Sequence, residues 1–340
     1  MILTPLLLGA LVLAQDAKLD ASRPHRSFRF VYSAAVPEVA PGAKQVRLWI
    51  PVPLDTPDQT ITNLALKASA GSGDTLVAGT GTGPRPADLA SGSKDGLRWT
   101  VADIGGGFGR SVCVESAGAP VAVELAFDAT RYETKGGGKA SPAELAELKQ
   151  ADQMIPLDGK VASIAASLKT PSEPRATARA LYEHTLERMN YGKPEGVPWG
   201  RGDAEWACDA KVGNCTDFHS YFIGLARTKH IPARFEMGFS VPAGPEEVAP
   251  IGGYHCWAYF WDDGHGWVPV DISEADKDAT KADYFFGTLD PNRVTMTGGR
   301  DLVLKPAPAK GALNFFIYPY AEVDGAPYDK VTKEFSRRNL

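Results

Sequence analysis

The sequence predicts an α+β protein in which an N-terminal β-sandwich precedes a domain of mixed helices and strands. Residues 25–130 contain short segments where apolar and polar residues alternate, separated by Gly, Pro, Ser and Asp clusters, which is typical of antiparallel strands. Helical spacing of apolar residues first appears beyond a glycine-rich segment at 133–142, and strand patterns then continue to the end. A chain of 340 residues is long enough for two domains.

The composition is that of a globular protein without a nucleic-acid surface. Of the residues, 44% are hydrophobic and 23% charged, and 36 Lys and Arg against 41 Asp and Glu give a net charge of −5. Because no block of Lys and Arg is present to follow a phosphate backbone, we expect no nucleic-acid partner. Four cysteines are too few for a disulfide scaffold.

The first fourteen residues, MILTPLLLGALVLA, are almost entirely apolar and carry no charged side chain. The run is too short to cross the hydrocarbon core of a bilayer, which is about 30 Å thick. The small side chains of Val12 and Ala14 fit cleavage after Ala14, although Lys and Arg are missing from the start of the segment. We therefore expect a signal peptide at 1–14 and an exported, periplasmic or secreted protein without a stable membrane anchor. A buried N-terminal strand or helix is the alternative.

Period-two patterns define the predicted sandwich. Phe28, Phe30 and Tyr32 alternate with polar neighbours, and a further strand at 46–50 ends at Pro51. Glycines and Pro142 then indicate a connection between domains. The predicted order is a β-sandwich at 25–130, a linker at 131–154, a catalytic domain at 155–305, and C-terminal strands at 306–340 that complete the catalytic domain. Strand patterns after the linker lie at 234–239, 254–261, 267–271, 302–304 and 315–320.

Two amphipathic helices are expected in the second domain. The first occupies 176–190, and the second follows Asn214, a good N-cap that makes Cys215 its first residue. Cys215 shares the apolar face of this helix with Phe218. The positive end of the helix dipole lowers the pKa of a thiol and favours the nucleophilic thiolate. A cysteine with this pattern alone is more often an inert buried side chain.

A predicted hairpin supplies the partners that such a thiol needs. Residues 254–261 alternate, and a turn centred on Asp263 leads into the strand 267–271. His255 then faces Asp271, about 5 Å away at Cβ, whereas a register slip of two residues would place Ser273 there. A carboxylate in this position orients the imidazole and stabilises the imidazolium. Cys215, His255 and Asp271 would supply nucleophile, base and orienting group for acyl transfer.

The motifs around these three residues resemble the transglutaminase-like superfamily. The matching segments are GNCTDF at 213–218, GLAR at 224–227, IPAR at 231–234, YHCWA at 254–258 and GWVPVD at 266–271. The resemblance covers roughly residues 155–305 and is closest to bacterial exported members, in which a similar β-domain often comes first. It implies a papain-like cysteine fold with Cys215, His255 and Asp271 as catalytic triad. Members include cross-linking enzymes, amidases, proteases and inactive scaffolds.

Other residues near the predicted nucleophile have competing interpretations. His219 lies one helical turn after Cys215 and could act as the base, but a core histidine is favoured because no carboxylate is evident to orient it. Trp199 and Trp206 precede the helix, where an indole N–H could help to form an oxyanion hole beside the Cys215 amide. Packing in the core is the alternative for both. Asp217 is interpreted as a first-turn acid that favours the helix dipole.

We expect no metal and no organic cofactor. The cysteines and histidines contain no C-x-x-C and do not have the spacing of a zinc knuckle. A D-x-D-x-D-G loop is also missing from the sequence, so calcium dependence is not expected. Cys208 and Cys256 could form a disulfide, since Cys256 points to the strand face opposite His255. The sequence leaves this pairing open.

The expected function is that of an exported cysteine-dependent hydrolase or acyltransferase. It would form a thioester at Cys215 with a peptide or amide carbonyl and hydrolyse it, as a cysteine protease or amidase does. Two alternatives remain open: a protein cross-linking transglutaminase that uses an amine acceptor, and a non-enzymatic binding module. The substrate could be a protein, a peptidoglycan stem peptide or a small amide, and neither this choice nor the oligomeric state follows from the sequence.

Overall fold

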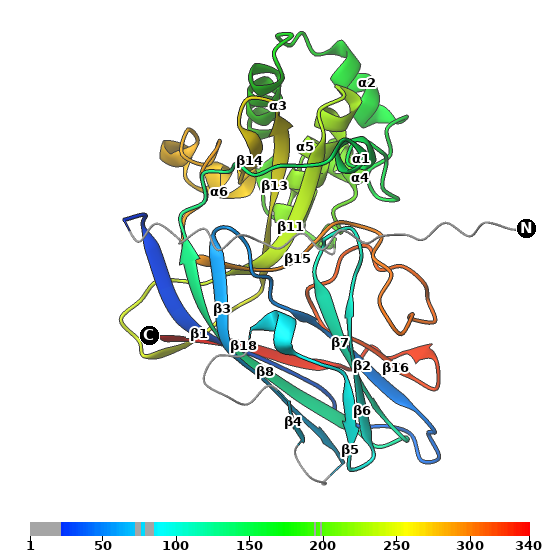
Figure 1. The fold of residues 1–340 in the computed structure, drawn as a ribbon. Helices are drawn as coiled ribbons and strands as arrows, with labels where there is room; N and C mark the ends of the chain where they lie inside the picture. Colours follow the sequence, from blue (N-terminus) through cyan, green and yellow to red (C-terminus); the bar gives the residue numbers. More distant parts are fainter. Residues whose placement is uncertain (1–21, 72–75, 79–84, 194, 198) are drawn as a thin grey trace, which may run out of the picture.

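The computed structural model of the protein describes residues 22–71, 76–78, 85–193, 195–197 and 199–340. A β-sandwich forms one end of the molecule, and helices around a smaller sheet form the other end (Figure 1). The predicted α+β class with an N-terminal β-sandwich is confirmed. The predicted signal peptide at 1–14 lies outside the described residues.

Two six-stranded sheets make up the sandwich. The strands are β1 (His25–Val36), β2 (Val46–Val52), β3 (Gln59–Ala70), β4 (Leu76–Ala78), β5 (Gly92–Lys94), β6 (Leu97–Asp103), β7 (Arg110–Ser116), β8 (Val121–Tyr132), β12 (Val248–Pro250), β16 (Tyr320–Val323), β17 (Ala326–Pro327) and β18 (Thr332–Asn339), with a 3-10 turn η1 (Pro86–Asp88). One sheet has the order β12-β18-β1-β8-β3-β4 and the other β17-β16-β2-β7-β6-β5. Phe28, Phe30 and Tyr32 of β1 are fully buried between the sheets, as their period-two spacing predicts.

The C-terminal strands complete the sandwich, so the prediction that residues 306–340 complete the catalytic domain is wrong. β18 pairs with β1, placing Phe335 opposite Tyr32, and β16 pairs with β2, placing Tyr320 opposite Trp49. The ring of Phe335 lies 4.7 Å from that of Tyr32. An alternating pattern shows that a segment is a strand, but the free edge that it joins depends on residues far away in the sequence.

The second part of the molecule surrounds a four-stranded sheet. Its helices are α1 (Pro142–Glu147), α2 (Lys160–Ser167), α3 (Pro174–Arg188), α4 (Ala204–Ala210), α5 (Cys215–Thr228) and α6 (Ile272–Lys277), with a 3-10 turn η2 (Ala279–Lys281). Its strands are β9 (Asn190–Tyr191), β10 (Val212–Gly213), β11 (Ala233–Ser240), β13 (Tyr254–Asp262), β14 (Gly266–Val270) and β15 (Arg293–Gly298). The sheet order is β14-β13-β11-β15. α5 is the central helix, and all its residues from Cys215 to Arg227 are buried.

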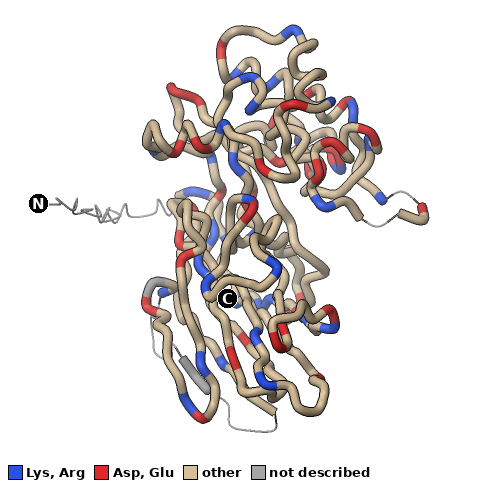
Figure 2. The backbone as a smooth tube through the Cα atoms, turned by 90° about the vertical axis from the view of Figure 1, so that its right-hand side faces the viewer, with Lys and Arg blue, Asp and Glu red and all other residues tan. Residues whose placement is uncertain are grey.

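Three of the strand patterns expected after the linker are strands, and the last two are not. Residues 302–304 make only a single bridge, from Leu302 to Leu313, and β16 begins at Tyr320. β15, which the sequence patterns did not predict, lies in the sequence between the β13–β14 hairpin and residues 302–304. Acidic and basic residues are interspersed along the backbone in both parts of the molecule (Figure 2). Within the described residues, no helix is long and apolar enough to cross a membrane.

Buried polar contacts join the two parts at β15. The Gln59 side chain on β3 donates to the carbonyl of Thr295 at 2.9 Å and accepts from its N–H at 2.8 Å. Arg131 on β8 donates to the Thr295 hydroxyl at 3.1 Å. The segment predicted as a linker is ordered, since Gly137 N–H bonds to Trp267 O at 2.8 Å. The sandwich therefore supports the second part directly.

Candidate active site

Cys215 is the first residue of α5, as the sequence predicts. The Asn214 side chain accepts the N–H of Thr216 at 2.9 Å, and the Asp217 carboxylate accepts the N–H of Asn214 at 2.9 Å, which forms a capping box. Capping leaves the Cys215 N–H without a partner inside the helix. The cysteine is only 2% exposed. The thiol thus lies at the positive end of a buried helix.

Asp217 has a larger role than the predicted one at the helix dipole. It also accepts the N–H of Gly202 at 2.9 Å, so it ties the loop that carries Trp199 to the start of α5. A Cβ atom at Gly200 would lie 2.1 Å from the Asp217 carboxylate, so only glycine fits there. Burial raises the pKa of Asp217 to about 6, although the two backbone N–H groups oppose this shift.

His255 and Asp271 are in contact, as predicted, but the predicted hairpin register is wrong. The His255 Nε2 lies 2.7 Å from the Asp271 Oδ2. Trp261 pairs with Trp267, and β14 ends at Val270, so the pairing is shifted by two residues. The turn is centred on Gly264 and not on Asp263, since Asp262 pairs with Gly266. Asp271 meets His255 because it leaves the strand and caps α6, where it accepts the N–H of Glu274 at 3.1 Å.

Arg293 on β15 is a site residue that the sequence analysis missed. Its Nη1 donates to the Asp271 Oδ2 at 2.8 Å, and its Nη2 donates to the Asp290 Oδ2 at 2.9 Å. The guanidinium also lies 4.9 Å from the Trp257 ring. Arg293 is 2% exposed and Asp271 is fully buried. Burial alone would raise the pKa of Asp271, but His255 and Arg293 hold it well below its usual range, so the carboxylate stays charged.

Electrostatic contacts favour an ion pair between Cys215 and His255. Burial would raise the pKa of the Cys215 thiol, but hydrogen bonds from Cys256 and His255 and the His255 charge lower it to about 5. Burial would lower the pKa of His255, but Asp271 and the sulfur of Cys215 raise it to about 10. Because Nε2 bonds to Asp271, Nδ1 is the nitrogen left to face the sulfur. A thiolate and an imidazolium therefore coexist over a wide pH range.

A cleft of about 570 Å³ opens above Cys215. Its lining residues are Tyr191, Trp199, Gly200, Asn214, Cys215, Ser240, Gly252, Gly253, Tyr254, His255, Lys277 and Tyr318. Trp199 is 45% exposed here, with its ring 6.1 Å from that of Tyr191. Trp206 on α4 packs against the hydrophobic core and is not among these lining residues. The structure thus brings Trp199 to the predicted site and leaves Trp206 outside it.

The remaining candidates occupy other roles. His219 is fully buried, and its Nε2 accepts the N–H of Ile272 at 3.1 Å, which suits a core histidine and leaves this nitrogen unavailable as a base. All four cysteines are free, so Cys208 and Cys256 do not form a disulfide in this structure. In the part of the chain that the structure describes, no group of three or more His, Cys, Asp and Glu side chains could hold a metal ion.

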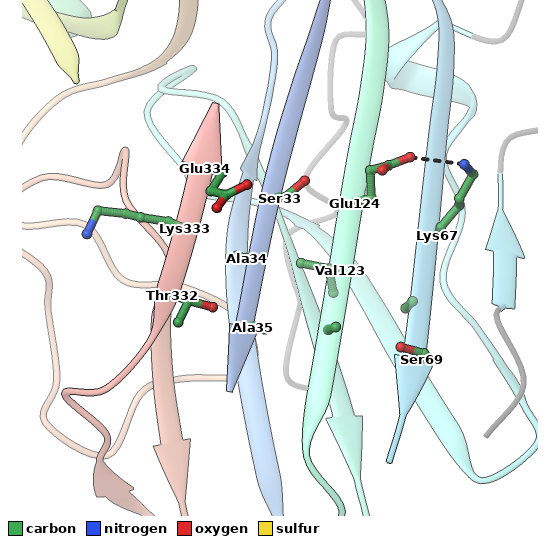
Figure 3. Close-up of a pocket in the computed structure, with 12 residues that line it drawn as sticks. Ser33, Ala34, Ala35, Lys67, Ser69, Val123, Glu124, Thr332, Lys333 and Glu334 are labelled. Atoms are coloured by element: carbon green, nitrogen blue, oxygen red, sulfur yellow. Dashed lines mark hydrogen bonds and ion pairs between the residues drawn. The ribbon is translucent and has the colours of Figure 1, made fainter. Parts of the chain in front are cut away.

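A second hollow lies on the outer face of the sandwich, across β18, β1, β8 and β3 (Figure 3). Ser33, Glu124 and Lys67 stand in one row of this face, and the Lys67 Nζ pairs with the Glu124 Oε1 at 3.0 Å. The other polar side chains that line this hollow are Ser33, Ser69, Thr332, Lys333 and Glu334, and its lining includes no histidine or cysteine. The cleft above Cys215 is therefore the better candidate for chemistry.

Comparisons with known proteins agree with this architecture. The family model of the transglutaminase-like superfamily matches residues 162–272, a range that contains Cys215, His255 and Asp271. An uncharacterized protein of Haemophilus influenzae is 36% identical over 168 residues, which are 40% of this chain and 46% of that protein. The match therefore spans about half the length of this relative.

Two solved structures match most of the length of the chain. A candidate cysteine protease from Cytophaga hutchinsonii matches with a TM-score of 0.53 and 14% identity, over 92% of this chain and 98% of its own. The periplasmic domain of TgpA from Pseudomonas aeruginosa matches with a TM-score of 0.36 and 13% identity, over 79% of this chain and 94% of its own. The first of these shares the overall fold of this chain.

Proposed function

Because residues 162–272 form a transglutaminase-like domain, we propose that the protein is a cysteine-dependent acyl-transfer enzyme with Cys215, His255 and Asp271 as its triad. One observation carries the proposal: the His255 Nε2 lies 2.7 Å from the buried carboxylate of Asp271. The other ring nitrogen, Nδ1, is therefore the one that can exchange a proton with Cys215. The sulfur lies at the first residue of α5 and lines an open cleft. This is the arrangement that activates a thiol for attack on a carbonyl.

In the first half-reaction, the Cys215 thiolate attacks the carbonyl carbon of a peptide or amide, and the carbonyl electrons move onto oxygen. In this proposal the Cys215 N–H stabilises the oxyanion, and the Trp199 indole N–H is the candidate for a second donor. The tetrahedral intermediate collapses as the C–N bond breaks and the His255 imidazolium gives its Nδ1 proton to the leaving amine. A thioester at Cys215 remains.

In the second half-reaction, neutral His255 takes a proton from water, and the water oxygen attacks the thioester carbon. The C–S bond breaks, the carboxylic acid leaves, and the thiolate–imidazolium pair is restored. For transfer to an amine, the amine must outcompete water, and a hydrophobic tunnel between Trp199 and Trp206 would favour this. The cleft is open, and only Trp199 of these two tryptophans lines it. Hydrolysis is therefore favoured. An amine that binds in the cleft would give cross-linking by the same steps.

A peptide or protein is the proposed substrate, and a peptidoglycan peptide belongs to this class. The cleft presents main chain at Gly200, Gly252 and Gly253, and backbone N–H and C=O groups recognise an extended peptide in a sequence-tolerant way. A Cβ atom at Gly252 would meet nothing within 4 Å, so space for such a peptide is available there.

The test is turnover of a mixed peptide library by purified protein, with products identified by mass spectrometry in water enriched in the heavy oxygen isotope. Hydrolysis would give new carboxyl termini that carry the heavy oxygen, whereas transamidation would give amide-linked products. Cys215→Ala and His255→Ala should each abolish turnover, and Cys208→Ala, which removes a buried thiol outside the cleft, should retain it. Turnover that persists in Cys215→Ala would refute the proposal.

We also propose that the enzyme works outside the cytoplasm after removal of residues 1–14. The support is the apolar, uncharged segment that ends in small residues at Val12 and Ala14. Sequencing the N-terminus of the protein recovered from a bacterial periplasm should give Gln15 as the first residue. Recovery in the cytoplasm with Met1 or Ile2 first would contradict export.

A further inference from the structure

The triad mechanism leaves a second thiol beside Cys215 unused. Cys256 follows His255 on β13, is fully buried, and packs against α5. Its Sγ lies 3.5 Å from the Nδ1 of His219. Its thiol and its backbone N–H both hydrogen-bond to Cys215. Cys256 thus connects His219 in the second turn of α5 with the nucleophile at the start of this helix.

The position of the proton on His219 follows from its neighbours. A backbone N–H can only donate, so the 3.1 Å contact from Ile272 requires a lone pair on Nε2. Asp271 Oδ1 lies 3.8 Å from this nitrogen, beyond hydrogen-bond distance. Burial lowers the pKa of His219 to about 4, so the ring is neutral at higher pH. Its single proton therefore lies on Nδ1, which faces the sulfur of Cys256 at 3.5 Å and also hydrogen-bonds to the backbone of Cys215.

The ionisation of Cys215 sets the direction of the hydrogen bond between Cys215 and Cys256. An ionised Cys215 has no proton to give, so in the hydrogen bond between the two side chains the S–H of Cys256 is the donor. Burial raises the pKa of Cys256, so this thiol keeps its proton when Cys215 ionises.

We propose that Cys256 is a further catalytic residue, whose S–H donates to the Cys215 thiolate while His219 holds it in position. The inference rests on the proposed function, because it concerns the same nucleophile. The thiolate is then stabilised from two sides, by the His255 imidazolium and by a neutral thiol that cannot compete for its proton. Loss of one hydrogen bond to a charged group would raise the pH at which Cys215 ionises by about one to two units.

Several other charged or titratable groups surround the two thiols, and all of them remain in the variants of residue 256 proposed below. They are His219 and Asp217 on α5, His255 and Tyr254 on β13, Tyr191 on β9, Lys277 on α6, Asp271 at the start of α6, Arg300 after β15, and Tyr318 before β16. A change at residue 256 alone therefore isolates the S–H donor.

The experiment measures the rate of iodoacetamide labelling at Cys215 across pH in the full chain, without substrate. Trypsin separates the four cysteines onto the peptides 111–131, 202–211, 212–227 and 235–277, so mass spectrometry reports Cys215 alone. Cys256→Ala should shift the labelling midpoint upward by about one to two pH units. Cys256→Ser, which keeps a donor, should stay within about half a unit of wild type, and Cys208→Ala should match wild type.

Two results would overturn the inference. One is a Cys256→Ala midpoint equal to that of wild type, and the other is an equal shift in the Ala and Ser variants, which would indicate packing and not donation. Cys256→Val refills the volume and replaces the Ala variant if that variant does not fold. If the proposed function itself is wrong, the result is different: the pH dependence of labelling at Cys215 would be the same in wild type and in His255→Ala. If only the role of Cys256 is wrong, the dependence on His255 persists.

Discussion

The shared proton of Cys215 and His255 predicts how the stability of the second part varies with pH. In the folded protein the pKa of Cys215 is lowered to about 5 and that of His255 is raised to about 10, so the pair binds one proton between these values. The unfolded pair, with ordinary pKa values of about 8.5 and 6.5, binds two protons at pH 5 to 6.5, one at pH 6.5 to 8.5, and none at pH 8.5 to 10.

The sign of the effect differs in the three ranges. Stability rises with pH where the unfolded state binds more protons and falls where it binds fewer. The pair should therefore stabilise the fold most between about pH 6.5 and 8.5, and this contribution should fall on both sides. At about 1.4 kcal/mol for each pH unit, the fall is about 2 kcal/mol by pH 5 and about 2 kcal/mol by pH 10.

Urea denaturation followed by tryptophan fluorescence measures this contribution, since five of the seven tryptophans lie between residues 199 and 267. The reference is the double variant Cys215→Ser/His255→Gln, which retains polar side chains without these titrations. The difference between the two stability curves should have a flat maximum and two declining arms. A difference that is constant from pH 5 to pH 10 would refute the shared proton. If the two arms are present, thiolate ultraviolet absorption that occurs in wild type and is lost in Cys215→Ser would show that the shared proton lies on His255.

Three further predictions concern residues around the site and the sandwich. Arg293→Met should lower the free energy of unfolding by about 3 kcal/mol, because it leaves the buried Asp271 with one cationic partner fewer. The control is Arg338→Met, which removes an exposed arginine and should cost less than about 1 kcal/mol. Equal urea midpoints for the two variants would contradict the argument. Asp217→Asn should destabilise by about 1 kcal/mol and raise KM more than it lowers kcat, since it loosens the loop that carries Trp199; an unchanged KM would count against this. Phe335→Ala should cost about 3 to 5 kcal/mol by thermal or urea unfolding, whereas a loss below about 1 kcal/mol would show that β18 is dispensable for the sandwich.

Local patterns in the sequence predict the elements that carry the site. The N-cap at Asn214 and the apolar spacing after it place Cys215 at the start of α5, because both are decided within one or two helical turns. The contact between His255 and Asp271 was also predicted, although through a register that is wrong by two residues. The position of the turn determines the register, and the sequence Asp262-Asp263-Gly264-His265 permits a turn centred on either Asp263 or Gly264.

Residues that act over long sequence distances could not be predicted in this way. Arg293 is 22 residues beyond Asp271, on a strand whose apolar residues are too few to give a clear period-two pattern. The tie between Asp217 and Gly202 spans 15 residues and depends on the path of an irregular loop. The C-terminal strands were assigned to the wrong part for the same reason. An alternating pattern indicates that a segment forms a strand, but it does not show which sheet edge the strand joins.

The long-range contacts also explain why the sandwich and the candidate active site belong to one structural unit. Gln59 and Arg131 in the sandwich hold Thr295 of β15 through three hydrogen bonds. Two residues earlier on the same strand, Arg293 holds Asp271, which orients His255. Because side chains two apart on a strand lie on the same face, a displacement of β15 relative to the sandwich would move the Asp271 anchor with it. The geometry at Cys215 therefore depends on buried polar contacts of a domain that contributes none of the proposed triad.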